Sequence, residues 1–181
     1  MGILKSLKEF IKKRILINKF PNSTFYDNVQ VDRVSKIGLK TVLFSNTSLI
    51  ESYIGDYTYL QKSTNVFKAV IGNYCSIGSN VSIGLPSHPV NFISTSPIFY
   101  DNSQPLKDFF VSKKITSENY NSTHVGSDVW IGQRVMIKSG LTIGTGAIIG
   151  AGSIVTKNIK PYSIVAGVPA RILRMRFPDK L

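Results

Sequence analysis

The hydrophobic positions of this chain recur with a period of six residues. From residue 71 the sequence reads IGNYCS, IGSNVS and IGLPSH, and from residue 125 it reads VGSDVW, IGQRVM, IKSGLT, IGTGAI, IGAGSI and VTKNIK. Isoleucine or valine opens each phrase, glycine usually follows, and a small or β-branched residue usually stands fifth. Six residues are too few for a helical unit and fit a short strand with a turn, whose first and fifth side chains face the same side.

A unit this short cannot bury its apolar face alone, so its copies must stack on one another and share a continuous core. The regular phrases cover roughly residues 54–160, and a less regular run begins near Ile37. The pattern therefore predicts an all-β solenoid over residues 25–168, with positions one and five filling a narrow interior. Cys75 stands in the small-residue column, which favours a place in this core over a role as nucleophile.

The two ends of the chain have a different pattern. Residues 3–17, within a segment of residues 1–24, predict an amphipathic basic helix whose apolar residues fall at helical spacing. These apolar residues are Leu4, Leu7, Ile11 and Ile15. The pattern favours a cover for the open end of the solenoid, with docking on a membrane surface as the alternative. At the other end Pro169 opens the phrase PARILRMRF and predicts a short helix in the tail of residues 169–181.

Charge is concentrated at the same two ends. The net charge is +12, and residues 1–20 and 157–181 each hold six basic residues and one acidic residue. Two basic ends indicate anionic partners such as phosphates or a membrane surface, and no nucleic-acid motif accompanies them. One cysteine and two histidines exclude a disulfide framework and a zinc cluster, so no metal is expected. No apolar run approaches a membrane span and no signal-peptide pattern is present, so we expect a cytoplasmic protein, either free or held at the cytoplasmic face of the membrane.

The six-residue pattern is interrupted over residues 85–124. A segment of this length is too long for an ordinary loop, and its many aromatic residues argue against disorder. It begins with SHP, which contains His88, and it ends with Glu118 and His124. A neutral histidine can accept a proton near neutral pH and a carboxylate can orient its ring, so His88 and Glu118 are candidates for a general base and its orienting group. A structural role for the loop histidine is the alternative.

The repeated phrase resembles the hexapeptide repeat of left-handed parallel β-helix proteins, in which three hexapeptides form one triangular coil. Over about residues 66–176 the chain resembles the hexapeptide O-acetyltransferases. SHP is similar to the His-Pro of maltose and galactoside acetyltransferases, while IGNYCSIG and PYSIVAGVPARIL are similar to xenobiotic acetyltransferases that modify chloramphenicol and streptogramins. HPVNFISTSPIFY is most similar to acetyltransferases of bacterial surface-polysaccharide loci. The resemblance implies a left-handed β-helix, acetyl-CoA as the donor, and a homotrimer with its site between neighbouring subunits.

The resemblance also implies roles for individual residues. His88 would be the general base, supported by Glu118, which stands seven residues before Val125 as the glutamate of the sugar enzymes does. A backbone N–H near Gly132 would stabilise the oxyanion. The residues at the family's donor-binding positions are Trp130, Gly132, Gln133, Ala151, Thr156, Lys157, Arg171 and Arg174. Gln133 stands where the family often has a smaller residue, and upstream of residue 66 the chain does not align, so acceptor-binding residues cannot be carried over.

These features lead us to expect an acetyl-CoA-dependent O-acetyltransferase that modifies a sugar hydroxyl in surface-polysaccharide biosynthesis. An acetyltransferase that inactivates an antibiotic would differ only in its acceptor. A non-catalytic β-helix scaffold is the alternative from another class. A carbonic anhydrase of the same fold needs three histidine ligands for its metal, and the two histidines of this chain exclude that arrangement.

Overall fold

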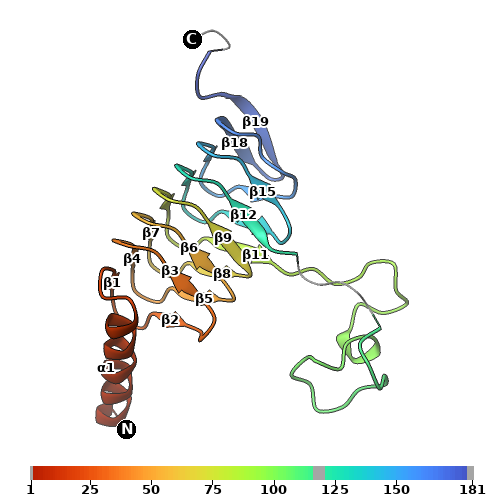
Figure 1. The fold of residues 1–181 in the computed structure, drawn as a ribbon. Helices are drawn as coiled ribbons and strands as arrows, with labels where there is room; N and C mark the ends of the chain where they lie inside the picture. Colours follow the sequence, from red (N-terminus) through yellow and green to blue (C-terminus); the bar gives the residue numbers. More distant parts are fainter. Residues whose placement is uncertain (1, 116–120, 179–181) are drawn as a thin grey trace.

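The chain winds into a triangular solenoid with a helix at one end and a long insert on one edge (Figure 1). The computed structural model describes residues 2–115 and 121–178, with side chains described from Glu9 onward. Within these residues the strands form three sheets, which we call sheets A, B and C. Successive strands of the solenoid visit sheets A, B and C in turn, so each coil contributes one strand to each sheet.

Sheet A has eight strands among the described residues, and its last strand is antiparallel to the one before it. The order is β1 (Thr24–Phe25), β4 (Val42–Leu43), β7 (Tyr59–Leu60), β10 (Ser76–Ile77), β13 (Trp130–Ile131), β16 (Ile148–Ile149), β18 (Ser163–Gly167) and β19 (Ala170–Met175). The other neighbours in this sheet are parallel, as the stacking of coils requires.

Sheets B and C are wholly parallel in the described part of the chain. Sheet B has the order β17 (Ile154–Val155), β14 (Met136–Lys138), β11 (Ser82–Leu85), β8 (Asn65–Phe67), β5 (Ser48–Ile50) and β2 (Gln30–Val31). Sheet C has the order β15 (Thr142–Ile143), β12 (Thr123–Val125), β9 (Ala69–Ile71), β6 (Tyr53–Ile54) and β3 (Lys36–Ile37). The expected parallel β-helix is confirmed, and the arrangement is consistent with the expected left-handed coil.

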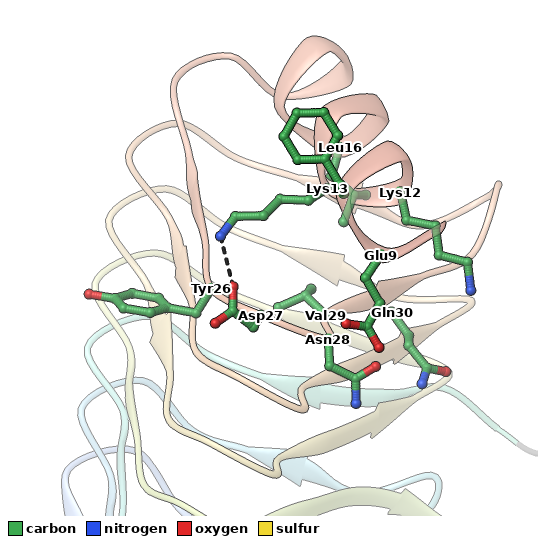
Figure 2. A pocket seen from close by; sticks show the side chains of 10 residues that line it. Glu9, Lys12, Lys13, Leu16, Tyr26, Asp27, Asn28, Val29 and Gln30 are labelled. Carbon is green, nitrogen blue, oxygen red and sulfur yellow. Dashed lines mark hydrogen bonds and ion pairs between the residues drawn. The ribbon is translucent and has the colours of Figure 1, made fainter. Parts of the chain in front are cut away.

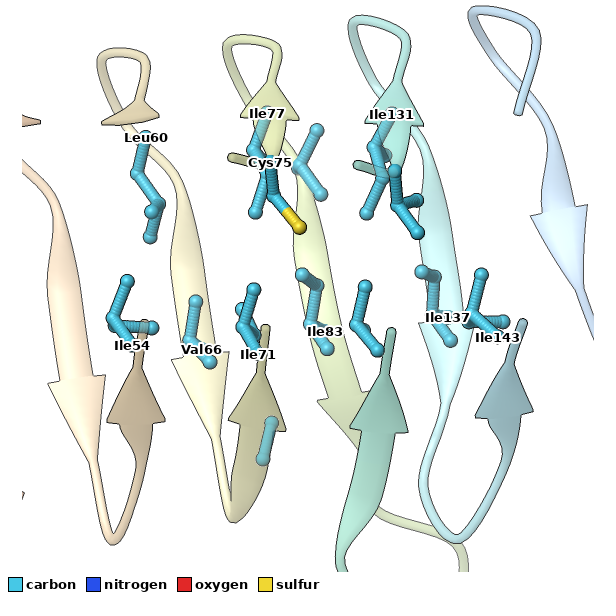
Figure 3. Close-up of a cluster of buried hydrophobic side chains, with 14 of the residues drawn as sticks. Ile54, Leu60, Val66, Ile71, Cys75, Ile77, Ile83, Ile131, Ile137 and Ile143 are labelled. Atoms are coloured by element: carbon cyan, nitrogen blue, oxygen red, sulfur yellow. The ribbon is translucent and has the colours of Figure 1, made fainter. Parts of the chain in front are cut away.

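The core is a column of the residues that open the six-residue phrases. Figure 3 shows these side chains stacked between the sheets, and Leu60, Ile77 and Ile131 are fully buried. Full burial of one such side chain stabilises the fold by roughly 1.5–3 kcal/mol relative to leaving it exposed. The predicted small-residue column also lies inside, because Cys75 is fully buried as well. The period of six thus sets both the coil and its interior.

The early coils are less regular in sequence because several of their phrases lack glycine at the second position, while threonine stands in the small-residue column. Thr58 and Thr64 are buried, and their hydroxyls donate hydrogen bonds of 2.9 Å to the carbonyls of Gly72 and Gly78 in the next coil. Threonine has nearly the shape of valine, and the hydrogen bond offsets the cost of burying its hydroxyl. The solenoid therefore begins at Thr24, before the repeat is recognisable in the sequence.

The predicted N-terminal helix is present as α1 (Gly2–Lys19). Its contact with the solenoid is through Leu16, which is only 8% exposed and joins the core. Ile11 and Ile15 of the predicted apolar stripe are 49% and 59% exposed. The stripe is therefore not the face that packs on the first coil, whereas Leu4 and Leu7 lie outside the described side chains.

The predicted C-terminal helix is wrong, because residues 170–175 form strand β19. This strand folds back on β18 with Gly167 opposite Ala170 and Ser163 opposite Met175. Gly167 adopts a φ of +102°, which glycine tolerates and which lets the chain reverse just before Pro169. The open edge of sheet A offers unpaired N–H and C=O groups, and pairing with that edge outweighs a short isolated helix.

The predicted interruption is an insert of residues 86–122 between β11 and β12. It leaves sheet B after Leu85, contains a short 3₁₀ helix η1 (Pro97–Phe99), and returns to sheet C at Thr123. The insert therefore occupies the edge between sheets B and C, where other coils have a short turn. Figure 1 shows it extending away from the solenoid.

Candidate active site

His88 lies at the start of the insert and its side chain is exposed. Its Nδ1 atom lies 2.8 Å from the hydroxyl oxygen of Tyr100. That hydroxyl in turn donates to the carbonyl of Thr95 at 3.2 Å. A tyrosine hydroxyl has one proton, and here it is donated to the carbonyl of Thr95. The hydroxyl oxygen of Tyr100 must therefore accept its second hydrogen bond from the Nδ1–H of His88. In the neutral imidazole this tautomer leaves a lone pair on Nε2, which is the arrangement that a general base requires.

Tyr100 is held firmly enough to orient the histidine. Its side chain is 4% exposed, and its ring meets the edge of Phe92 at a centroid distance of 5.6 Å. Its backbone N–H donates to the carbonyl of Pro97 at 3.0 Å, and its carbonyl accepts from Ile115 at 2.8 Å. The sequence gives no sign of this role, because the tyrosine lies twelve residues from His88 among many aromatic residues.

Asp101 anchors the loop beside Tyr100. Its side chain is almost fully buried, and it accepts hydrogen bonds from the side chains of Ser103 and Gln104. Lys114, from the far side of the insert, forms an ion pair with it at 3.4 Å. The hydrogen bond from Ser103, together with those of Gln104 and the charge of Lys114, holds the pKa of Asp101 well below its usual range. The carboxylate thus ties two distant parts of the insert together.

Trp130 stands on the outer face of sheet A in a row of paired residues. Its neighbours in register are Ile148, then Ile164, then Arg174, one on each successive strand. Trp130 is 57% exposed and Arg174 is also exposed. Three strand spacings separate them, roughly 14 Å, so the row offers an apolar wall at one end and a cation at the other.

Gly132, Gln133 and Ala151 lie at the edge between sheets A and B, next to this row. A Cβ on Gly132 would lie 2.5 Å from the backbone nitrogen of Ala151, so glycine is needed for the coils to stack. The N–H of Gly132 donates to the carbonyl of Ile149 at 2.8 Å. Because this N–H belongs to the ladder of the coils, it is not free to serve as the expected oxyanion donor.

The C-terminal hairpin presents two arginines and fixes a third. Arg171 and Arg174 are exposed, and each donates to a neighbouring backbone carbonyl of its own strand. Arg176 is different, because it forms an ion pair with Asp128 at 2.9 Å and donates to the carbonyl of Gly146 at 2.8 Å. The first two guanidinium groups are therefore the ones placed to meet an anionic ligand.

Thr156 and Lys157 lie apart from this group. Both are exposed and follow β17 at the edge between sheets B and C. This is the edge from which the insert leaves after β11, two strands away in sheet B. The expected donor residues thus fall into two sets in one chain. One set lies on sheet A and its edge with sheet B, and the other lies at the edge that carries the insert.

Other residues considered from the sequence have simpler places. Cys75 is fully buried, and burial raises the pKa of its thiol, so it is part of the core. His124 lies on β12 with its side chain exposed. Glu118 lies outside the described residues. Within the described ranges no three His, Cys, Asp or Glu side chains gather as a metal site.

Residues 122–157 match the family model described as "Bacterial transferase hexapeptide (six repeats)". These residues carry the bacterial transferase hexapeptide repeat. A chloramphenicol acetyltransferase from Klebsiella aerogenes is 40% identical to this hexapeptide-repeat chain over 119 residues, which are 64% of the chain and 55% of that relative. The chain spans about half the length of the curated relatives it matches.

Two solved structures share the fold. AntD, an N-acyltransferase from Bacillus cereus in complex with dTDP and 3-hydroxybutyryl-CoA, has a TM-score of 0.63 at 17% identity, covering 92% of this chain and 88% of that one. The acetyltransferase domain of PglB from Neisseria gonorrhoeae FA1090, in complex with acetyl coenzyme A, has a TM-score of 0.61 at 17% identity, covering 91% and 66%. At this level of identity the likeness concerns the fold.

Proposed function

We propose that this hexapeptide-repeat protein is an acetyl-CoA-dependent O-acetyltransferase that acts on a sugar hydroxyl in the making of a bacterial surface polysaccharide. The observation that carries the proposal is the orientation of His88, whose Nδ1 is held by Tyr100 while Nε2 is left to accept a proton. The repeat match and the acetyltransferase relatives supply the reaction class.

His88 would act as the general base. Its Nε2 would take the proton of the acceptor hydroxyl as the oxygen attacks the acetyl carbonyl, and Tyr100 would hold the resulting imidazolium in place through Nδ1–H. Glu118 remains a second candidate for stabilising that charge. Base catalysis of this kind contributes roughly 10²–10⁴-fold to the rate. The proton can then leave with the thiol of the product, so no covalent enzyme intermediate is required.

The exposed residues of the C-terminal coils fit acetyl-CoA, which supplies the activated acetyl group when bound. A Cβ on Gly152 would meet nothing within 4 Å, so the surface beside Ala151 is open to a thin ligand chain. Arg171 and Arg174 would bind its phosphates, because a guanidinium group can form bidentate hydrogen bonds with phosphate oxygens. Trp130 would offer a flat apolar wall beside them.

A homotrimer would bring the two separated sets of residues together. In one chain the insert carries His88 away from the solenoid, whereas Trp130 and the arginines lie on sheet A (Figure 1). We infer that the insert of one copy reaches the donor residues of its neighbour, so that each site uses two chains. Thr156 and Lys157, at the same edge as the insert, would then line the same cleft.

A second candidate acceptor is an antibiotic of the chloramphenicol class. It is favoured by the 40% identity to a chloramphenicol acetyltransferase, and it differs from the first candidate only in the hydroxyl that is presented to His88. His88 would serve as the base for either acceptor.

The test is acetyl transfer by the purified protein to a panel of sugars, nucleotide sugars and chloramphenicol, followed as release of free CoA thiol. We expect His88→Ala to lose at least about a hundredfold in rate. His124→Ala is the matched control, because it removes the other histidine, which is exposed on β12, and we expect its rate to be unchanged. A His88→Ala rate above about one tenth of wild type would refute the base assignment. If wild type transfers acetyl to no acceptor and acetyl-CoA does not raise its melting temperature, the scaffold alternative replaces the enzyme.

A further inference from the structure

Among its described side chains, helix α1 contacts the first coil through Leu16, Lys13 and Lys19, and the Nζ of Lys19 donates to the carbonyl of Arg33 at 3.1 Å. Leu16 is buried in the core, and Lys13 donates to Asp27 of the first coil at 3.0 Å. Figure 2 shows this ion pair bridging the helix and the coil beside a hollow of about 490 Å³. Over the described side chains the attachment is therefore a short line of contacts, and most residues from Glu9 to Lys19 are exposed.

The uncovered face of α1 is apolar. Ile11 and Ile15 are one helical turn apart and about half exposed, and Ile11 lies roughly 140° around the helix from Leu16. Phe10 and Ile17 are also exposed, but they lie on a different side of the helix, beyond Arg14. Several large apolar side chains on one short helix exceed the scattered exposure that is ordinary for a protein surface.

Basic residues flank this apolar face on both sides. At about 100° per residue, Lys12 and Lys19 fall beside Ile15, and Arg14 falls beside Ile11. All three are exposed. Residues 1–20 hold six basic residues and one acidic residue, so this segment has a net positive charge. An apolar stripe bordered by cations is the arrangement of helices that lie in the interface of an anionic bilayer.

We propose that α1 docks the protein on an anionic lipid surface, with its Ile11–Ile15 face in the interface and with Lys12 and Arg14 among the headgroups. In the described part of the chain no helix has the length and apolar content to cross a bilayer, so the contact would be parallel to the membrane plane. The cations on both flanks favour an anionic lipid surface over a protein groove, because headgroups can meet them on either side of the apolar stripe.

The place of α1 in the fold suits a shared contact. The helix lies at one end of the solenoid and the C-terminal hairpin lies at the other (Figure 1). In the proposed trimer of parallel copies, three helices would point to one plane, and each would raise the effective concentration of the next. This last point rests on the proposed trimer, whereas the docking of a single helix does not.

The experiment is sedimentation of the full-length protein with vesicles of phosphatidylcholine alone and of equal parts phosphatidylcholine and phosphatidylglycerol. We expect the wild type to pellet with the mixed vesicles, to stay in solution with the neutral ones, and to be released in about 1 M salt, where charges are screened within about 3 Å. Ile11→Glu/Ile15→Glu should abolish pelleting. Val34→Glu/Leu39→Glu is the matched control, because it puts the same charge on two exposed apolar residues of the first coil, and it should pellet like wild type.

Each other outcome overturns the proposal. If the wild type stays in solution with mixed vesicles, or pellets equally with neutral ones, an anionic lipid surface is not its partner. If both double variants lose pelleting equally, the change in net charge alone explains the loss, and the Ile11–Ile15 face has no special role. If Ile11→Glu/Ile15→Glu changes the sedimentation coefficient of the protein without vesicles, the face packs on a second copy instead. Acetyl transfer to a water-soluble acceptor, measured without vesicles, keeps this test separate from the proposed reaction.

Discussion

The contact between His88 and Tyr100 is the residue-scale feature on which the proposed chemistry depends. A histidine with both ring nitrogens free can rotate and exchange tautomers, and a hydrogen bond to Nδ1 removes both freedoms. Tyr100 provides this bond from a buried position within the insert. It is a positioning residue, since it acts on the acceptor only through His88.

Tyr100→Phe should therefore lower kcat by roughly 2- to 10-fold with little change in KM for acetyl-CoA, because one neutral hydrogen bond contributes about 0.5–1.5 kcal/mol. Steady-state kinetics with both substrates varied would measure this. Phe92→Leu is the control, since it removes the ring contact at 5.6 Å and keeps the hydroxyl. If Phe92→Leu reduces kcat as much as Tyr100→Phe, general packing of the insert explains the loss and the positioning role fails.

Asp101 gives the insert a dependence on pH whose sign follows from its depressed pKa. A carboxyl with a lower pKa in the folded state stabilises the fold above its unfolded pKa of about 3.9, and that stabilisation is lost as the pH falls below this value. Amide hydrogen exchange in the insert should therefore be slower in wild type than in Asp101→Asn near neutral pH. The difference should shrink as the pH drops below about 4. A difference that stays constant with pH would show that the charge of Asp101 does not hold the insert.

Among the elements, strand β19 decides which arginines are left exposed and which is paired. Its pairing with β18 puts Arg174 opposite Ile164, in line with Trp130, and Arg171 opposite Ala166. Arg176, just beyond the strand, pairs with Asp128 and closes the hairpin against the last coils. A helix over the same residues would have distributed these three side chains around its axis.

Arg171→Gln/Arg174→Gln should weaken acetyl-CoA binding by roughly 10- to 100-fold, because hydrogen bonds to charged groups contribute about 1.5–3 kcal/mol. Titration calorimetry would give the dissociation constant. Arg176→Gln is the matched control, which should lower the melting temperature through loss of the Asp128 ion pair and leave the affinity unchanged. Equal affinities in the double variant and wild type would move the donor site away from this hairpin.

For the whole molecule, one copy of the chain holds the insert with His88 on a different edge of the solenoid from Trp130 and the hairpin arginines. The insert leaves from the edge between sheets B and C, whereas Trp130 and the hairpin belong to sheet A. A closed ring of three copies would place the B–C edge of one copy near the sheet A side of the next. Sedimentation equilibrium would then give three times the chain mass of 20.0 kDa.

Mixed trimers would test whether the site spans two chains. His88→Ala chains and Arg171→Gln/Arg174→Gln chains should regain activity when unfolded and refolded together. The assay uses acetyl-CoA well below the weakened dissociation constant, so that each variant alone is nearly inactive. With random assembly of equal amounts, about a quarter of the sites would combine an intact insert with an intact hairpin. Activity no greater than that of the separate variants would show that each chain builds its own site.

The solenoid, its core and the place of its interruption follow from the period of the sequence alone. A period of six with a β-branched residue at each first position is compatible with few other structures. Every phrase forms the same short strand and turn, and neighbouring copies bury its apolar side chains. The position of His88 at the start of the insert followed from the same break in the pattern.

Three other features were set by contacts between residues that lie far apart in the sequence, and these contacts are visible only in the folded chain. Residues 170–175 became a strand because the edge of sheet A was available, and Leu16 rather than the Ile11–Ile15 stripe packed on the first coil. Tyr100 came to His88 through the folding of the insert on itself. Local periodicity reports which face of an element is apolar, but the neighbour that covers this face, or leaves it bare, is set by the whole fold.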